Sequence, residues 1–464
     1  MGIQSFELEP SKENIINTIA KNLIDRNQSV WQFVRFCDAQ GGKCSIALDA
    51  KWGFGKTFFV KQAKILLESF NKFTNEISEE ERRTVRAAFS QYIGSGDNAI
   101  NIQPQVCVYY DAWSNDNDVD PVLSLIYEIV RTTACHYPIK KEIGWGEAAT
   151  SIIDFFTGRN VKKCIESLRG EDLLLELKEQ KDIHATIEEF LDSLLSERGN
   201  RLVVFIDELD RCKPSYAVQI LERIKHYFSN DRITFVFSVN VDELQHTVKR
   251  YYGEGFDACR YLDRFFDYRM ELPPANMVKY YREIGLDNGE WVFESVCKAV
   301  ARHYGFGLRE IEKFYRTAKI AAYKPTHDDY LGVFSKERGL QVSLFLFVPI
   351  MIGLRMVDVE LYHNFINGNN SNPLIEIASN EESLSEFCSM LLEQNEVYDE
   401  EHCSEIRTVV RIEDKLNLVY NALFNKNVEY SGKEISVGKC SFSRQTGEEI
   451  LRIVSMMSEY AKFE

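Results

Sequence analysis

The residues best suited to chemistry lie in one stretch, Ala50–Thr57, which reads AKWGFGKT. Glycines at 53 and 55 let the backbone turn its N–H groups toward an anion, which larger side chains would obstruct. Lys56 and Thr57 complete the pattern GxxxxGK[ST], in which the lysine meets the β- and γ-phosphates and the hydroxyl binds Mg²⁺. A short apolar strand precedes the stretch and an amphipathic helix follows it, so we predict a phosphate-binding loop (P-loop).

One position departs from this pattern, because the first glycine slot holds Ala50. Alanine is restricted at positive φ, so the loop is expected to begin in an ordinary backbone region. A chance string in a turn is the alternative for so short a motif. The residues expected to contact the nucleotide are Lys51, Trp52, Gly53, Phe54, Gly55, Lys56, Thr57 and Phe58.

Two further segments end in polar residues that suit a nucleotide site. Within the segment Arg201–Asp210, five consecutive apolar residues end in Asp207 and Glu208. Such a run is typical of a central parallel strand, and α/β folds place ligands at the carboxyl ends of these strands. The next apolar run ends at Asn240. If the two strands are neighbours, Asn240 lies near Asp207.

The elements that position these residues alternate along the chain. Strands are predicted at 46–48, 105–110, 201–206, 232–239 and 268–272, with helices between them. This order predicts an α/β fold: a P-loop doubly wound parallel sheet with helical insertions and a C-terminal all-helical domain. The predicted domains are an N-terminal helical segment over 1–42, the core over 43–274 with insertions at about 75–103 and 131–200, and a helical lid or C-terminal domain over 275–464.

Composition narrows the classes of function. The 464 residues carry a net charge of −16, which argues against a general nucleic-acid-binding surface. The 11 cysteines form no CxxC pair and the eight histidines show no metal-type spacing, which indicates reduced thiols in a cytoplasmic protein. The apolar run 340–356 contains polar residues and Pro349, so a buried helix is favoured over a membrane span.

The segments DAKWGFGKT, YYDAW, VVFIDELDRCKP, ITFVFSVN and YLDRFF…ELP together resemble the KAP family of P-loop NTPases over about Gln28–Leu354. Two departures are Ala50 and the absence of the transmembrane pair that many members insert between the nucleotide motifs. The corresponding region here, Arg131–Asn200, is polar. The resemblance is therefore to the soluble bacterial or mobile-element members, and no membrane anchoring is expected.

The resemblance implies a role for each matching residue. Asp207 would hold Mg²⁺ together with Thr57, Glu208 would polarise the attacking water, and Asn240 would act as a sensor of the γ-phosphate. Arg211 would brace the acidic pair or reach a neighbour, and the alternative is a structural ion pair with Asp207 or Asp210.

Other residues are assigned with a structural alternative beside each. Arg309 is expected as a lid arginine, or as a plain surface residue of its helix. P-loop switches often complete their site with an arginine, and Arg264 is the candidate, predicted near the edge of the nucleotide cleft. The hypothesis is that Arg264 acts on the nucleotide of a second copy, in an oligomer that forms on ATP. The alternative is that Arg264 pairs with Asp263 or Asp267. Trp52 and Trp113 are predicted to be packing residues in preference to nucleotide contacts.

These features predict Mg²⁺-dependent ATP hydrolysis that serves as a conformational switch. The resemblance alone suggests a cytoplasmic regulatory or anti-phage defence assembly, with protein partners encoded nearby and a possible homo-oligomer. The alternatives are a scaffold that binds ATP tightly with little turnover and, with less support, a small-molecule phosphotransferase.

Overall fold

The computed structural model describes residues 9–94, 100–118, 120–137, 187–286, 292–327, 338–379, 384, 388–394, 396–397, 408–425 and 434–460. Most of the predicted insertion at 131–200 lies outside them. The chain divides into two compact units, with the boundary between Tyr280 and Tyr281. The first unit, which we call the P-loop unit, contains the residues singled out above, except Arg309.

The P-loop unit is built on a five-stranded sheet in the order β2-β3-β4-β1-β5, in which all pairs are parallel. The strands are β1 (Cys44–Asp49), β2 (Gln105–Asp111), β3 (Arg201–Asp207), β4 (Ile233–Val239) and β5 (Tyr268–Glu271). Every residue of β3 and β4 is buried, because helices cover both faces of a parallel sheet of this kind. The predicted α/β P-loop fold is confirmed.

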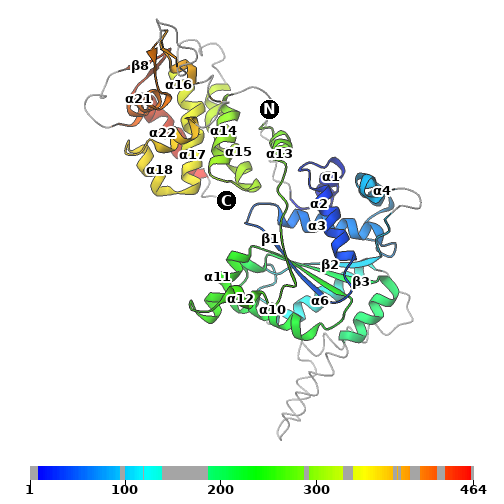
Figure 1. The fold of residues 1–464 in the computed structure, drawn as a ribbon. Helices are drawn as coiled ribbons and strands as arrows, with labels where there is room; N and C mark the ends of the chain where they lie inside the picture. Colours follow the sequence, from blue (N-terminus) through cyan, green and yellow to red (C-terminus); the bar gives the residue numbers. More distant parts are fainter. Residues whose placement is uncertain are drawn as a thin grey trace. The chain divides into compact units, whose positions relative to one another are not determined.

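Alternate residues along each strand enter two separate cores, one on each face of the sheet. Val203 and Phe205 pack with the helices before and after the P-loop, whereas Val204 and Ile206 pack with the later helices. Figure 1 shows these two helical layers on opposite sides of the strands. The first layer contains α1 (Lys12–Lys21), α2 (Asn27–Asp38), α3 (Lys56–Phe70), α4 (Glu79–Ala88) and α5 (Ser90–Ile93). The second contains α6 (Pro121–His136), the helix 187–198, α10 (Pro214–Tyr227), α11 (Val241–Tyr252) and α12 (Ala258–Leu262).

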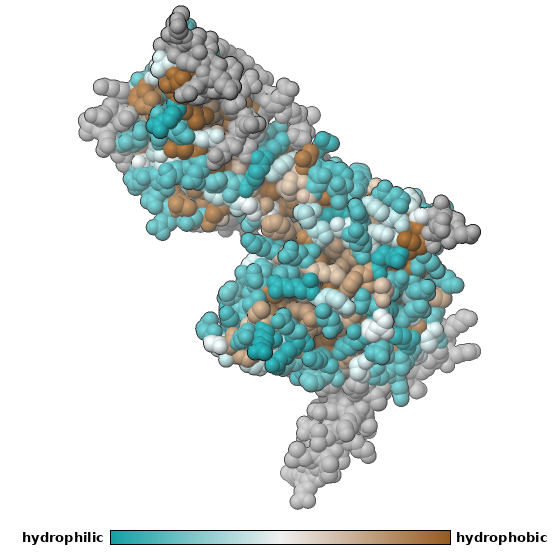
Figure 2. All heavy atoms as spheres, in the orientation of Figure 1, coloured by the Kyte–Doolittle hydropathy of each residue, from teal (hydrophilic) through white to brown (hydrophobic). Residues whose placement is uncertain are grey.

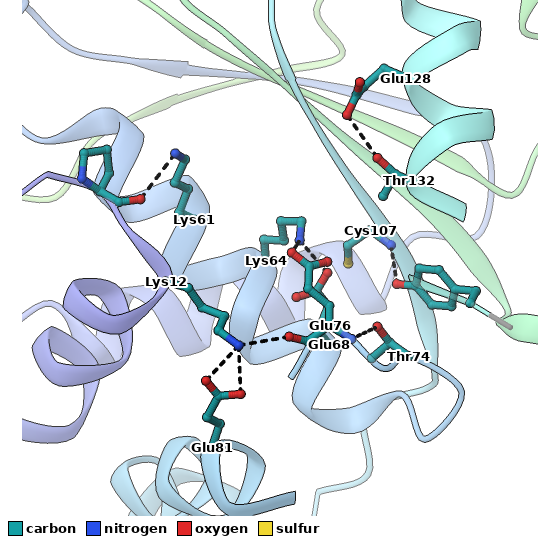
Figure 3. Close-up of polar contacts among 12 residues, drawn as sticks. Lys12, Lys61, Lys64, Glu68, Thr74, Glu76, Glu81, Cys107, Glu128 and Thr132 are labelled. Carbon is teal, nitrogen blue, oxygen red and sulfur yellow. Dashed lines mark hydrogen bonds and ion pairs between the residues drawn. The ribbon is translucent and has the colours of Figure 1, made fainter. Parts of the chain in front are cut away.

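The helix that follows the P-loop, α3, is held by buried charges near its carboxyl end. Lys64 forms ion pairs of 2.6 Å with Glu68 and with Glu76 (Figure 3). Arg82 of α4 donates to the carbonyls of Glu68 and Ser69 at 2.8 and 2.9 Å, which satisfies groups that lack partners at a helix end. The other charged side chains of α4 are exposed or half-buried.

The second unit is helical, as predicted, with a few short strands added. Its helices are α14 (Val292–His303), α15 (Leu308–His327), α16 (Arg338–Val342), a π-helical turn Ser343–Phe347, α17 (Val348–Val357), α18 (Val359–Ile366), α19 (Asn372–Ser379), a 3₁₀ turn Ser389–Leu391, α21 (Ile412–Phe424) and α22 (Arg444–Tyr460); α13 (Met277–Glu283) spans the unit boundary. The strands are β6 (Glu396–Val397), β7 (Thr408–Val409), β8 (Ile435–Val437) and β9 (Cys440–Phe442).

The segment Gly339–Val357 is long and apolar enough to cross a membrane, but 72% of its most apolar window is buried inside the structure. Its side chains pack on other helices of the same unit, as Phe347 does on Phe365 and Phe424. Figure 2 shows hydrophilic residues over most of the visible face of the P-loop unit, with apolar residues in smaller groups.

Candidate active site

The predicted P-loop links the carboxyl end of β1 to the first residue of α3. Gly53 and Gly55 both have positive φ, 82° and 87°, and Gly55 caps α3. Ala50 has no such backbone angle, and its N–H donates to the carbonyl of Val239 in β4 at 3.2 Å. The two glycines thus occupy the positions at which the loop backbone has positive φ. The strand–loop–helix geometry of a phosphate-binding loop is present. This geometry argues against a chance string.

The ammonium group of Lys56 lies inside the loop. Its Nζ donates to the carbonyls of Ala50 and Lys51 at 2.5 and 3.2 Å, and the residue is 9% exposed. Burial lowers the pKa of Lys56 below its usual value, while the charges of Asp210, Asp207 and Glu208 oppose that shift. A phosphate group in the loop would supply a direct counter-charge to this buried cation.

Thr57 and Asp207 meet at the carboxyl edge of the sheet. The Thr57 hydroxyl donates to Oδ2 of Asp207 at 2.7 Å, and Asp207 is 1% exposed. A carboxylate and a hydroxyl fit Mg²⁺, which prefers oxygen ligands and takes the rest from phosphates and water. The described residues contain no cluster of three or more His, Cys, Asp or Glu that could hold a metal alone, so this pair suits a metal that arrives with a nucleotide.

Glu208 follows Asp207 in a left-handed backbone conformation, with φ 60° and ψ 24°. Its N–H donates to Oδ1 of Asp207 at 3.0 Å. Burial and then the charge of Asp207 raise the pKa of Glu208 to about 7. Such backbone conformations cost energy in a non-glycine residue and cluster at functional sites. Glu208 thus has the position and the environment of a group that orients or deprotonates water.

Arg211 forms its ion pair with Glu208, a member of the acidic pair, and not with Asp207 or Asp210, the partners of the structural alternative. The reason is local: Arg211 ends the single 3₁₀ turn Leu209–Arg211, and Glu208 stands three residues before it. This contact corresponds to the predicted bracing of the acidic pair, with Glu208 as the braced member.

Asn240 lies at the same edge of the sheet as Asp207, as the neighbouring strands require. Asp207 pairs in register with Ser238 of β4, two residues before Asn240. The side-chain oxygen of Asn240 caps α11 by accepting from the N–H of Glu243 at 3.4 Å. Its amide NH₂ group is then the part suited to bind a phosphate or a water.

Arg264 is not near its own nucleotide cleft, contrary to the prediction. The chain passes from Arg264 to Asp267, whose N–H donates to the carbonyl of Ser45 at the start of β1. Since the P-loop follows the other end of β1, Arg264 and Lys56 lie at opposite edges of the sheet. Within the described residues Arg264 forms no ion pair with Asp263 or Asp267, so the structural alternative is wrong as well. The prediction was wrong because a residue just before a parallel strand lies at the amino edge of the sheet.

Arg309 belongs to α15 in the second unit, where its side chain is exposed. Its assignment as a lid arginine therefore stays a prediction.

Trp52 and Trp113 are not buried packing residues, which corrects the expectation. Their side chains are 44% and 51% exposed. The Trp52 indole N–H donates to Oδ2 of Asp210 at 2.6 Å, and both rings lie against Arg211. Each ring follows the carboxyl end of a strand, where it meets polar and charged groups of the site.

Two residues of the site were missed from the sequence. The Tyr109 hydroxyl donates to Oδ2 of Asp207 at 2.9 Å. Tyr109 pairs in register with Phe205, two residues before Asp207, so the same face of the sheet presents both side chains. Burial and then the charge of Asp207 raise the pKa of this hydroxyl. Knowing that β2 and β3 pair would have revealed it.

The second missed residue is Arg26, which directly precedes α2. It is 2% exposed and donates to the carbonyl of Phe54 in the P-loop at 3.1 Å. Burial lowers its pKa to about 10. The N-terminal helices are thereby tied to the loop, and no local pattern in the sequence indicates this contact.

Comparison with solved structures gives only distant likenesses. The Aeropyrum pernix ORC2 protein, in ADPNP–ADP complexes, is 14% identical, covers 96% of this chain and 94% of its own, and has a TM-score of 0.31. Drosophila ORC bound to GC-rich DNA and Cdc6 is 10% identical, with 98% and 64% coverage and a TM-score of 0.34. No curated protein matches the chain.

The model of the KAP family P-loop domain matches residues 12–286, which is more than half of the chain and includes every element of the P-loop unit from α1 to β5. The P-loop, the Asp207–Glu208 pair and the sheet that joins them all fall inside this match. The chain therefore belongs to the KAP family of P-loop NTPases.

Proposed function

We propose that this protein is a Mg²⁺-dependent ATPase. The observation that carries the proposal is the hydrogen bond from Thr57 to Asp207, with Glu208 next along the chain. This arrangement combines a phosphate loop, a metal-binding pair and a carboxylate for water at one edge of the sheet.

Each residue has a distinct task in this mechanism. The loop N–H groups and Lys56 bind and orient the phosphates. Thr57 and Asp207 would hold Mg²⁺, which supplies charge neutralisation on the phosphate oxygens. Glu208 orients the attacking water and accepts its proton, and Asn240 donates to the γ-phosphate or to that water.

Glu208→Gln tests this assignment. Glutamine keeps the shape of the side chain but removes its basicity, so hydrolysis is expected to fall by roughly two to four orders of magnitude. ATP should still bind with near wild-type affinity by calorimetry. Glu254→Gln, a substitution at an exposed position just after α11, is the matched control and should retain full activity. A Glu208→Gln protein that hydrolyses ATP at the wild-type rate would overturn the assignment.

The hydrolysis is proposed to drive a conformational switch in a cytoplasmic regulatory or anti-phage defence assembly. Family membership supports the nucleotide chemistry, and the assembly is an analogy with soluble members. Fractionation of cells in low salt without detergent tests the location, since a cytoplasmic protein stays in the supernatant. ATPase rate against protein concentration, with and without proteins encoded nearby, tests the assembly.

One observation favours a second candidate, a scaffold that binds ATP tightly with little turnover. Glu208 is paired with Arg211, and a carboxylate held in this way is less free to accept a proton from water. Single-turnover kinetics separate the two functions. A slow chemical step in the presence of partners would favour the scaffold, and a fast one the ATPase.

A further inference from the structure

Three loops at the carboxyl edge of the sheet, which follow β1, β2 and β3, contact one guanidinium group. Arg211 lies 5.6 Å from the ring centroid of Trp52, in the P-loop, and 5.5 Å from that of Trp113, just after β2. The same group forms the ion pair with Glu208 after β3. Arg211 is therefore in contact with the P-loop, the β2 end and the proposed catalytic carboxylate at once.

The surroundings of Arg211 restrict its movement. Trp52 is tied by its indole N–H to Asp210, which is 5% exposed. The carbonyl of Asp210 accepts from Thr247 of α11 at 3.4 Å, and the N–H of Arg211 donates to the carbonyl of Glu208 at 3.1 Å. The planar guanidinium can stack on both aromatic rings while it pairs with a carboxylate, which a lysine ammonium cannot do equally well.

Glu208 needs such a partner. The carboxylates of Asp207 and Asp210 are close enough to repel it, and Arg211 and Lys56 are the cations that oppose this repulsion. Lys56 is committed to the carbonyls of the P-loop and to incoming phosphate. Arg211 is thus the cation that determines where the Glu208 carboxylate points.

We propose that Arg211 is a positioning residue for Glu208, held in place by Trp52 and Trp113, and that Trp52 transmits occupancy of the P-loop to Glu208 through this guanidinium. The inference rests on the proposed ATPase function and adds a mechanism by which nucleotide binding sets the orientation of the catalytic carboxylate. The inference gives a role to the exposed Trp52 and Trp113, which neither bind the metal nor take part in the reaction.

The test uses the full chain and starts from Trp113, which lies outside the P-loop. Trp113→Ala should lower kcat about tenfold, as expected when a partly exposed cation–π contact is lost, with KM and ATP affinity changed less than twofold. Trp113→Phe keeps a ring and should keep most of the activity. Tyr127→Ala, which removes a ring of similar exposure on α6, is the matched control and should behave as wild type.

A double-mutant cycle then asks whether Trp113 acts through Arg211. Arg211→Ala alone should lower kcat by at least as much as Trp113→Ala, and Arg211→Lys should restore only part of it. Adding Trp113→Ala to Arg211→Ala should have no further effect, because the contact is already gone. Fully additive losses, or Trp113→Ala at the wild-type rate, would overturn the inference.

Tryptophan fluorescence separates the proposed coupling from a purely structural role of these residues, because a structural role predicts no change of emission on ATP binding. In a Glu208→Gln background, which limits turnover, ATP should change the emission, and Trp52→Phe should remove most of that change. Arg211→Ala should weaken the change contributed by Trp113 while calorimetry shows intact ATP binding. An unaltered Trp113 response would count against the coupling.

Two outcomes separate the proposed function from this inference. If the wild-type protein does not hydrolyse ATP at all, the proposed function fails. If it hydrolyses ATP and the losses in the double-mutant cycle are additive, only this inference fails.

Discussion

The hydroxyl of Thr57 donates a 2.7 Å hydrogen bond to the carboxylate of Asp207, a residue 150 positions further along the chain. The contact forms because α3 begins where the P-loop ends, while β3 ends at the same edge of the sheet two strands away from β1. It brings together the proposed metal-binding pair from two segments that the sequence separates by an entire insertion.

Lys56→Ala is expected to abolish measurable ATP binding while the fold survives. The ammonium is buried in the loop among its carbonyls, and alanine offers no charge for the β- and γ-phosphates. Calorimetry measures binding, and circular dichroism with thermal unfolding checks the fold. Unchanged nucleotide affinity would remove the P-loop assignment.

Tyr109→Phe is expected to raise the Mg²⁺ concentration needed for half-maximal ATPase activity about tenfold, the lower end of effects seen for residues that support metal ligands. The reason is that the Tyr109 hydroxyl orients the Asp207 carboxylate. Tyr110→Phe is the matched control, since the Tyr110 hydroxyl lies on the other face of β2, bonded to Ser124 at 2.9 Å. Identical Mg²⁺ curves for Tyr109→Phe and wild type would contradict the prediction.

Lys64→Ala is expected to lower the free energy of unfolding by about 3–5 kcal/mol, because it leaves the buried carboxylate of Glu68 and the half-buried carboxylate of Glu76 without their cation. The Lys64 and Glu68 side chains are 8% and 0% exposed. Urea denaturation gives the measurement. Lys12→Ala breaks the exposed pair with Glu81 in the same region and should cost less than about 1 kcal/mol. Equal losses of unfolding free energy for Lys64→Ala and Lys12→Ala would mean that burial does not make the Lys64 ion pairs more important for stability than the Lys12–Glu81 pair.

Arg264 lies at the edge of the sheet opposite its own P-loop, so the predicted role in ATP hydrolysis requires a nucleotide site on another copy of the chain. Arg264→Ala and Lys56→Ala should each be inactive alone. Mixed together they should recover part of the activity, since one hybrid site then has both an intact P-loop and an arginine. Normal turnover by Arg264→Ala, or no recovery at any mixing ratio, would reject an arginine acting between copies.

Local sequence determined the parts of the site that are contiguous in the chain. The two glycines, Lys56 and Thr57 fall on one loop, and backbone geometry follows from residue type there: glycines take the positive φ angles and Ala50 does not. Strands such as β3 can be predicted from their apolar runs, because a strand that is buried on both faces must be apolar throughout. The same rule placed Asp207 and Glu208 at the end of that strand.

The relationships between segments depend on the tertiary fold, because strand order and register are set by long-range packing and not by local periodicity. The pairing of β2 with β3 brings Tyr109 to Asp207, and the packing of α2 brings Arg26 to the P-loop. Parallel pairing of β5 with β1 puts Arg264 at the edge away from Lys56. Of the three nearby acids Asp207, Glu208 and Asp210, Arg211 forms its ion pair with Glu208. One tight turn and two tryptophan rings fix the position of its guanidinium group.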